Sequence, residues 1–213
     1  MEKTIESIYQ GIVDGDQHLV AQKVTEAINA GLAPEIILKD GLVAAMSEVG
    51  RLFENGEYYV PEMLIAARAM QVGLKLLKPG LADTCVKATG RVLIGTVAGD
   101  LHDIGKNLVG MMLEGAGYEV IDLGTDIKPE AFVSSVSEYR PDIVAMSALL
   151  TTTMPNMEAT INALEAAGLR KKVKIIIGGA PITEEYCKKI GADGFGYDAS
   201  QAVKVALAMI GRP

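Results

Sequence analysis

The spacing of apolar residues changes part-way along the chain, and this change constrains the fold more than any other feature. Over residues 1–78 the apolar residues recur every three or four positions, as Ile5, Ile8 and Ile12 do in "TIESIYQGIV". This period predicts amphipathic helices, and Gly and Pro breaks divide the stretch into four of them. Four helices with short links predict a helical bundle.

Beyond residue 90 the apolar residues gather in short, nearly continuous runs. The runs "RVLIGTV", "YEVIDLG", "DIVAMSAL", "VKIIIGG" and "ADGFGY" predict five strands. Strands that are apolar throughout are buried on both faces, which indicates a doubly wound parallel sheet covered by helices on each side. The fold class is therefore α/β with an N-terminal four-helix bundle. The helices of the second part are expected at residues 104–116, 129–138, 154–167, 184–190 and 200–210.

The stretch "KPGLADTCVKATG", residues 78–90, breaks the helical pattern and predicts a linker. We therefore expect a helical domain at residues 1–88 and a sheet-containing domain at residues 89–213.

Composition excludes several classes of partner. The net charge of −7 disfavours nucleic acid and anionic membranes, because both bind cationic surfaces. The chain contains no Trp and no uninterrupted apolar stretch that could span a bilayer, and its first residues do not resemble a signal peptide. Its two cysteines, Cys85 and Cys187, lack metal-site spacing. We expect a cytoplasmic protein.

The candidate chemistry lies where the first predicted strand ends, in "GDLHDIG". Asp100 precedes His102 by two residues, so its carboxylate can accept the N–H of one ring nitrogen and leave the other free for a metal. A single protein nitrogen suits a metal whose other positions come from a macrocycle. The alternative is a histidine with a purely structural role.

Two other functions of doubly wound sheets fit this loop poorly. A dinucleotide site requires G-x-G-x-x-G, which is absent, and the Asp-His-Asp cluster would repel a pyrophosphate. A phosphate-accepting response domain requires several carboxylates around magnesium and a lysine at a later strand end. Here the fourth strand ends in Gly178-Gly179.

The spacing of three motifs resembles that of the cobalamin-binding domain family, whose pattern is D-x-H-x-x-G, S-x-L and G-G. Asp100 and His102 begin the first motif; after 41 residues (106–146) comes "SAL", and after 28 more (150–177) comes "GG". The segment "VGRLFENGEYYVPEMLIAARAM", residues 49–70, is similar to the helical cap of methionine synthase and of the small corrinoid proteins of anaerobic methyltransferase systems. The two similarities cover nearly the whole chain and leave no room for a catalytic barrel.

The resemblance implies a cobalamin or related corrinoid cofactor, including methylcobalamin, bound base-off and His-on. In this arrangement His102 binds cobalt, and Asp100 and Thr153 hydrogen-bond behind the imidazole as a proton relay. The displaced base lies beside Ser147, Leu149, Gly178 and Gly179. The other cofactor-binding positions that the resemblance implies are Gly99, Leu101, Asp103, Ile104, Gly105 and Thr151, Gly194 and Tyr197 along the nucleotide tail, and Phe53 and Val60 above the methyl group.

The resemblance also implies a function. The chain would be a non-catalytic subunit that carries a methyl group from a substrate:corrinoid methyltransferase to an acceptor methyltransferase using tetrahydrofolate or coenzyme M, with a reductive activase as third partner. Methylamines, quaternary amines such as betaines, methanol and methoxylated aromatics are all donors that the resemblance allows, and it favours the amines among them. A cobalamin-dependent regulator and a mutase small subunit are the alternatives. Charged residues around Phe53 are either docking contacts or a solvated helix face: Arg51, Glu54, Glu57 and Glu62.

Overall fold

The computed structural model describes residues 2–82 and 88–210, which form two compact units. One unit contains residues 2–82 together with 115–117, and the other contains residues 88–114 and 118–210. Residues 83–87, inside the expected linker, lie outside the described residues. No helix in the described ranges is long and apolar enough to cross a membrane.

The first unit is helical, as the apolar period predicted. Its core side chains are almost completely buried and come from every long helix, including Ile8, Val20, Met46 and Met70. Helix α1 packs on α2, and α2 packs on α5. The elements are α1 (Glu2–Val13), α2 (Gln17–Asn29), α3 (Pro34–Ile36), the π-helix η1 (Ile37–Val43), α4 (Ala44–Glu54) and α5 (Val60–Ala82).

Two details of this unit differ from the sequence prediction. The third helical segment contains a π-helical stretch, where Gly41 lies so close to α1 that a Cβ would be 3.2 Å from Ile8 Cγ2. The last helix continues beyond Lys78, through Pro79 to Ala82, so the linker cannot begin at residue 78. A Cβ on Gly80 would lie 3.1 Å from the Pro34 ring, so tertiary packing supports this last turn despite the proline.

The second unit has a parallel sheet, and its strand order is β2-β1-β3-β4-β5 in the described residues. The register aligns Thr96 with Ser147, and Ser147 with Gly178, at the carboxyl ends of adjacent strands. The five predicted strands are confirmed as β1 (Arg91–Thr96), β2 (Glu119–Asp122), β3 (Ile143–Ser147), β4 (Lys174–Gly178) and β5 (Gly194–Gly196).

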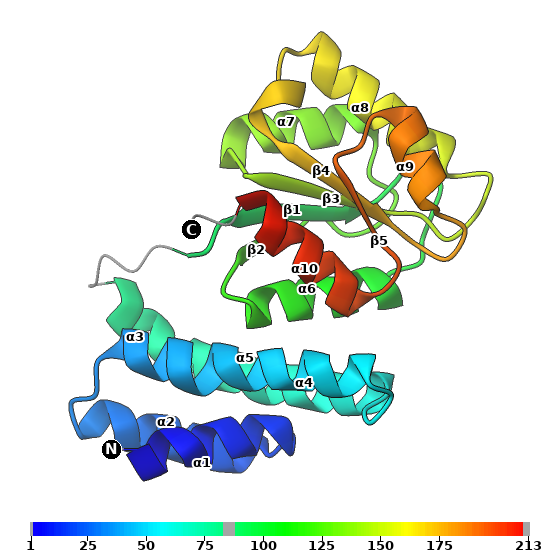
Figure 1. Cartoon of the computed structure of the whole chain (residues 1–213). Helices are drawn as coiled ribbons and strands as arrows, with labels where there is room; N and C mark the ends of the chain where they lie inside the picture. Colours follow the sequence, from blue (N-terminus) through cyan, green and yellow to red (C-terminus); the bar gives the residue numbers. More distant parts are fainter. Residues whose placement is uncertain (1, 83–87, 211–213) are drawn as a thin grey trace. The chain divides into compact units, whose positions relative to one another are not determined.

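Helices cover both faces of this sheet. Helices α7, α8 and α9 lie on one face, and α6 and α10 lie on the other (Figure 1). Phe132 of α7 and Met157 of α8 are completely buried against Leu93 and Val144 of the sheet. From β1 the chain adds β2 on one side and then β3 to β5 on the other, so the strand order reverses between β1 and β3. Ligands of such folds bind at the carboxyl ends of the strands beside that point. The bounds are α6 (Ile104–Gly115), α7 (Pro129–Tyr139), α8 (Pro155–Ala166), α9 (Glu184–Ile190) and α10 (Ala199–Ile210).

Candidate functional site

Asp100 is completely buried in the loop between β1 and α6, and its first oxygen faces His102. The imidazole Nδ1 of His102 lies 2.7 Å from Asp100 Oδ1, and the backbone N–H of His102 donates to the same oxygen at 3.1 Å. This carboxylate oxygen therefore fixes both the ring and the backbone of His102.

The second oxygen of Asp100 joins this loop to the one after β3. Oδ2 accepts hydrogen bonds from the backbone N–H of Leu149 at 2.8 Å and of Leu150 at 3.2 Å. The Thr153 hydroxyl lies 2.8 Å from Oδ2 and 2.9 Å from the Leu150 carbonyl oxygen, so its single hydrogen can serve either acceptor. The structure thus brings Asp100, His102 and Thr153 together in the arrangement that the resemblance implied.

The charge state of Asp100 follows from these contacts. Burial alone would raise the pKa of the carboxyl group, because a low dielectric disfavours the ionised form. Hydrogen bonds from His102, the Leu149 N–H and Thr153 outweigh burial and hold the pKa of Asp100 well below its usual range. A buried, ionised carboxylate is therefore available to His102 at neutral pH.

His102 differs from Asp100 in being exposed, with 52% of its side chain accessible. Its Nδ1 is held by an ionised carboxylate, which favours the tautomer with hydrogen on Nδ1 and a free lone pair on Nε2. Nε2 is therefore the atom that can bind a metal, and the Asp100 contact orients the ring that carries it.

In the part of the chain that the structure describes, His102 is not accompanied by a cluster of metal ligands. No group of three or more His, Cys, Asp and Glu side chains among residues 2–82 and 88–210 could hold a metal ion. One imidazole alone is a poor site for a free cation, whereas it suits a metal whose equatorial positions are occupied by a macrocycle.

Exposed apolar side chains gather on the loops at the carboxyl edge of the sheet. Leu101 and Ile104, on either side of His102, are 73% and 76% exposed. Apolar residues this exposed commonly mark a surface that binds a ligand or partner. The face of a corrin ring is broad and apolar, although its rim carries amides, so these residues would suit such a group beside His102. Further exposed apolar residues on the same edge are Leu149, Leu150 and Tyr197.

The glycines that the motif singles out also have structural causes. Gly179 has φ +128°, and a Cβ there would lie 1.9 Å from the Ala148 carbonyl oxygen. A Cβ on Gly178 would lie 2.9 Å from the Gly196 carbonyl oxygen, and one on Gly194 would lie 2.4 Å from Met209. Backbone atoms therefore require small residues at Gly178 and Gly179, whereas at Gly194 the close neighbours are side-chain atoms.

The remaining predicted positions lie in three places. Thr151 is exposed in the loop after β3, and Ser147 is half-buried at the end of β3. Gly99, Asp103 and Gly105 lie in the segment around His102. Phe53, half-buried near the end of α4, and Val60, exposed at the start of α5, belong to the helical unit.

Several residues that support the loop were missed by the sequence prediction. Asp126 accepts a hydrogen bond from the Gly99 N–H, and Asn156 donates to the Ala98 carbonyl. The buried Thr96 hydroxyl donates to the His102 carbonyl oxygen at 2.9 Å. Each of these contacts joins a side chain to a backbone atom, so no residue spacing in the sequence indicates them.

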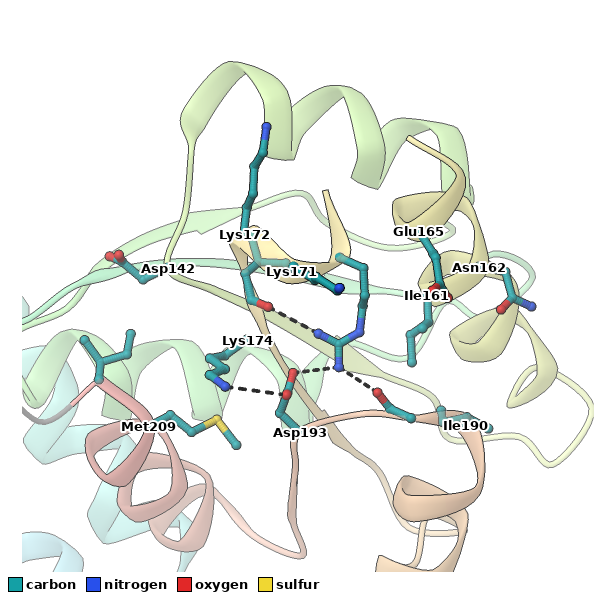
Figure 2. A pocket seen from close by; sticks show the side chains of 14 residues that line it. Asp142, Ile161, Asn162, Glu165, Lys171, Lys172, Lys174, Ile190, Asp193 and Met209 are labelled. Atoms are coloured by element: carbon teal, nitrogen blue, oxygen red, sulfur yellow. Dashed lines mark hydrogen bonds and ion pairs between the residues drawn. The ribbon is translucent and has the colours of Figure 1, made fainter. Parts of the chain in front are cut away.

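A separate hollow of about 690 Å³ lies at the amino edge of the same sheet (Figure 2). Asp193 lies between two cations there: Arg170 Nη2 is 2.9 Å and Lys174 Nζ is 3.8 Å from its carboxylate oxygens (Figure 2). None of the predicted site residues lines this hollow. The predicted site at the carboxyl edge is therefore separate from this hollow.

The chain is similar to known proteins over nearly its whole length. Residues 90–205 match the B12 binding domain family, and residues 4–78 match a second B12 binding domain family. The chain is 41% identical to trimethylamine corrinoid protein 1 of Methanosarcina acetivorans over 211 residues, 98% of each chain. It is 40% identical to a corrinoid protein of Desulfitobacterium hafniense, again over 98% of each.

Two solved structures resemble the whole chain. A cobalamin-binding protein from Desulfitobacterium hafniense is 34% identical, with a TM-score of 0.79 over 97% of this chain and 98% of that one. A chain of the methanol:cobalamin methyltransferase complex from Methanosarcina barkeri is 31% identical, with a TM-score of 0.89 over 100% of this chain and 81% of that one. The protein therefore belongs to the family of small B12-binding corrinoid proteins.

Proposed function

We propose that this protein carries a methyl group on a corrinoid cofactor between two methyltransferases. The observation that supports this best is the exposed His102 imidazole. Its Nδ1 is held by the buried Asp100 carboxylate, and exposed apolar residues lie on either side of it in the loop. A regulator or a mutase subunit is less well supported, because the similar proteins described above are corrinoid proteins of methylamine and methanol systems.

His102 would hold the cobalt of a base-off corrinoid through Nε2. When bound, the corrinoid supplies a cobalt atom whose other face accepts and releases the methyl group. Asp100 orients the imidazole and favours its Nδ1–H tautomer. Behind the imidazole, the Thr153 hydroxyl can shift its hydrogen between the Asp100 carboxylate and the Leu150 carbonyl.

Other residues are proposed to hold the organic parts of the cofactor. The apolar side chains beside His102 exclude water from the lower face of the ring. Ser147, Leu149, Thr151 and the glycine pair Gly178-Gly179 accept the displaced base. Gly194 and Tyr197 line the nucleotide tail, while Phe53 and Val60 of the helical domain shelter the methyl group. The domains are assigned to residues 1–88 and 89–213.

The partners are proposed from the relatives and from the chemistry. Trimethylamine corrinoid proteins are 41–43% identical to this chain, which favours a methylated amine as donor and its corrinoid methyltransferase as first partner. The second partner is a methyltransferase that passes the methyl group to tetrahydrofolate or coenzyme M. A reductive activase returns oxidised cofactor to the active state.

The test measures methyl transfer and cobalt ligation separately. The apo-protein is loaded with methylcobalamin, and demethylation by a coenzyme M or tetrahydrofolate methyltransferase is followed by absorbance. Replacing His102 by Gly should leave the fold intact, shift the visible spectrum towards that of a His-off corrinoid and slow transfer. Replacing His18, the other histidine of the chain, by Gly is the matched control. Unchanged spectra and rates in the His102 variant would refute the ligand assignment.

A further inference from the structure

Asp126, in the loop between β2 and α7, has an unusual backbone conformation beside the His102 loop. Its φ is +57°, and in the described residues only Arg140 is another non-glycine residue with positive φ. Asp and Asn adopt this left-handed conformation more readily than other side chains. Asp126 is therefore of a residue type that suits this conformation.

Two hydrogen bonds connect Asp126 to the loop that bears the imidazole. The Gly99 N–H donates to Asp126 Oδ1 at 2.7 Å, and the Asp126 N–H donates to the Asp100 carbonyl oxygen at 3.0 Å. Asp126 thus fixes the backbone both just before and at Asp100. The loop that contains Asp126 is also hydrogen-bonded to β1, because the Ile127 N–H donates to the Thr96 carbonyl oxygen at 2.9 Å.

We propose that Asp126 is a positioning residue for the cobalt ligand, an inference that rests on the proposed function. The imidazole is exposed, and its ring is held through Asp100. Any displacement of the Asp100 backbone therefore moves His102 Nε2 relative to the metal. Contacts that orient a metal-binding histidine commonly change metal affinity by about 10-fold to 100-fold when they are removed.

Two substitutions separate the side-chain bond from the backbone conformation. Glycine and asparagine both tolerate positive φ, so neither substitution strains the backbone. Asp126→Gly removes the acceptor of the Gly99 N–H, whereas Asp126→Asn keeps an acceptor oxygen. Asp142→Gly is the matched control, because Asp142 Oδ2 also accepts a backbone N–H, from Arg91 at 2.8 Å, and its own N–H also donates to a carbonyl oxygen. Asp142 immediately precedes β3 at the amino edge of the sheet, away from His102.

The first measurement uses protein labelled with ¹⁵N-histidine and loaded with cob(II)alamin. Electron paramagnetic resonance detects splitting from a cobalt-bound histidine nitrogen, and a titration gives the corrinoid dissociation constant. We expect Asp126→Gly to raise that constant about tenfold and to reduce the histidine splitting. Asp126→Asn should stay within about threefold of the unsubstituted protein, and Asp142→Gly should match it.

The second measurement needs no cofactor. The hydrogen-bonded Nδ1–H proton of His102 is observed by NMR in the apo-protein, where His18 is the other histidine to assign. Asp126→Gly should broaden this signal through faster exchange with water, and Asp142→Gly should not. Unchanged dissociation constant, splitting and proton signal in Asp126→Gly would refute the positioning role. Absence of histidine splitting in the unsubstituted protein would instead refute the ligand assignment, and with it this proposal.

Discussion

Replacing Asp100 by Asn should weaken corrinoid binding about 10-fold to 100-fold while leaving the sheet folded. The new amide can present its oxygen to the Leu149 and Leu150 N–H groups and to Thr153, which keeps the connection to the loop after β3. Its NH₂ group then faces His102, where it cannot accept a hydrogen bond.

The size of the effect follows from what His102 loses. Its backbone N–H, 3.1 Å from Oδ1, loses an acceptor, and its Nδ1 must become the acceptor of a hydrogen bond from the amide. The ring hydrogen then moves to Nε2, the nitrogen that has to bind cobalt. Hydrogen bonds to charged groups are worth about 1.5–3 kcal/mol, which corresponds to about one to two orders of magnitude in affinity.

The assay is a spectrophotometric titration of the apo-protein with cobalamin, together with urea unfolding of each variant. Asp142→Asn makes the same substitution at a carboxylate that accepts a backbone N–H on the opposite edge of the sheet, and it should bind cobalamin like the unsubstituted protein. The reasoning is refuted if Asp100→Asn binds within about twofold of the unsubstituted protein and shows the same His-on spectrum.

Three further predictions concern stability and docking. The pKa of Asp100 is lower in the folded protein than in the unfolded chain, so its contribution to stability is present above about pH 4 and is lost as the pH falls towards the folded pKa. The difference in urea stability between the unsubstituted protein and Asp100→Asn should therefore shrink on acidification, and a constant difference would argue against this linkage. Gly179→Ala should destabilise the fold by about 3 kcal/mol in thermal unfolding, because its Cβ would overlap a carbonyl oxygen; Gly168→Ala, also at positive φ but in open space, should cost about 1 kcal/mol. Similar losses for both would show that the overlap is relieved easily. Reversing Glu54 and Glu57 to Lys should slow methyl transfer from the cognate methyltransferase without changing corrinoid affinity, and equal rates at low and high salt would count against a docking role.

The sequence predicted the α/β unit closely because buried parallel strands have a nearly continuous apolar pattern. The bounds of α9 agree with the prediction at both ends, and those of α7 differ by one residue. Strand β2 is shorter than predicted, and it is an edge strand with partly exposed residues. The Asp100–His102 contact was predictable because two residues of one loop can meet through local geometry.

The π-helix and the support of the loop were not predictable in the same way. A π-turn inserts one residue into a pattern that an α-helix also fits, and the close contact of Gly41 with Ile8 depends on how two helices pack. Asp126 acts through the backbone of Gly99 and Asp100, 27 residues from the first of them. Backbone donors and acceptors are the same for every residue type except proline, so sequence spacing carries no signal for such contacts.

The hydrogen bonds of Asp100 also bear on the order in which the protein matures. Its partners Leu149 and Thr153 lie 49 and 53 residues away, across the β1–β3 pairing. Contacts of such long sequence separation form only after the intervening loop has closed. A nascent chain that has not yet paired these strands lacks the contacts that anchor Asp100, so productive cofactor insertion should follow tertiary folding. A corrinoid that binds only the folded protein stabilises it more as the free corrinoid concentration rises. A cell short of corrinoid would therefore accumulate apo-protein, which is less stable than the cofactor-bound protein.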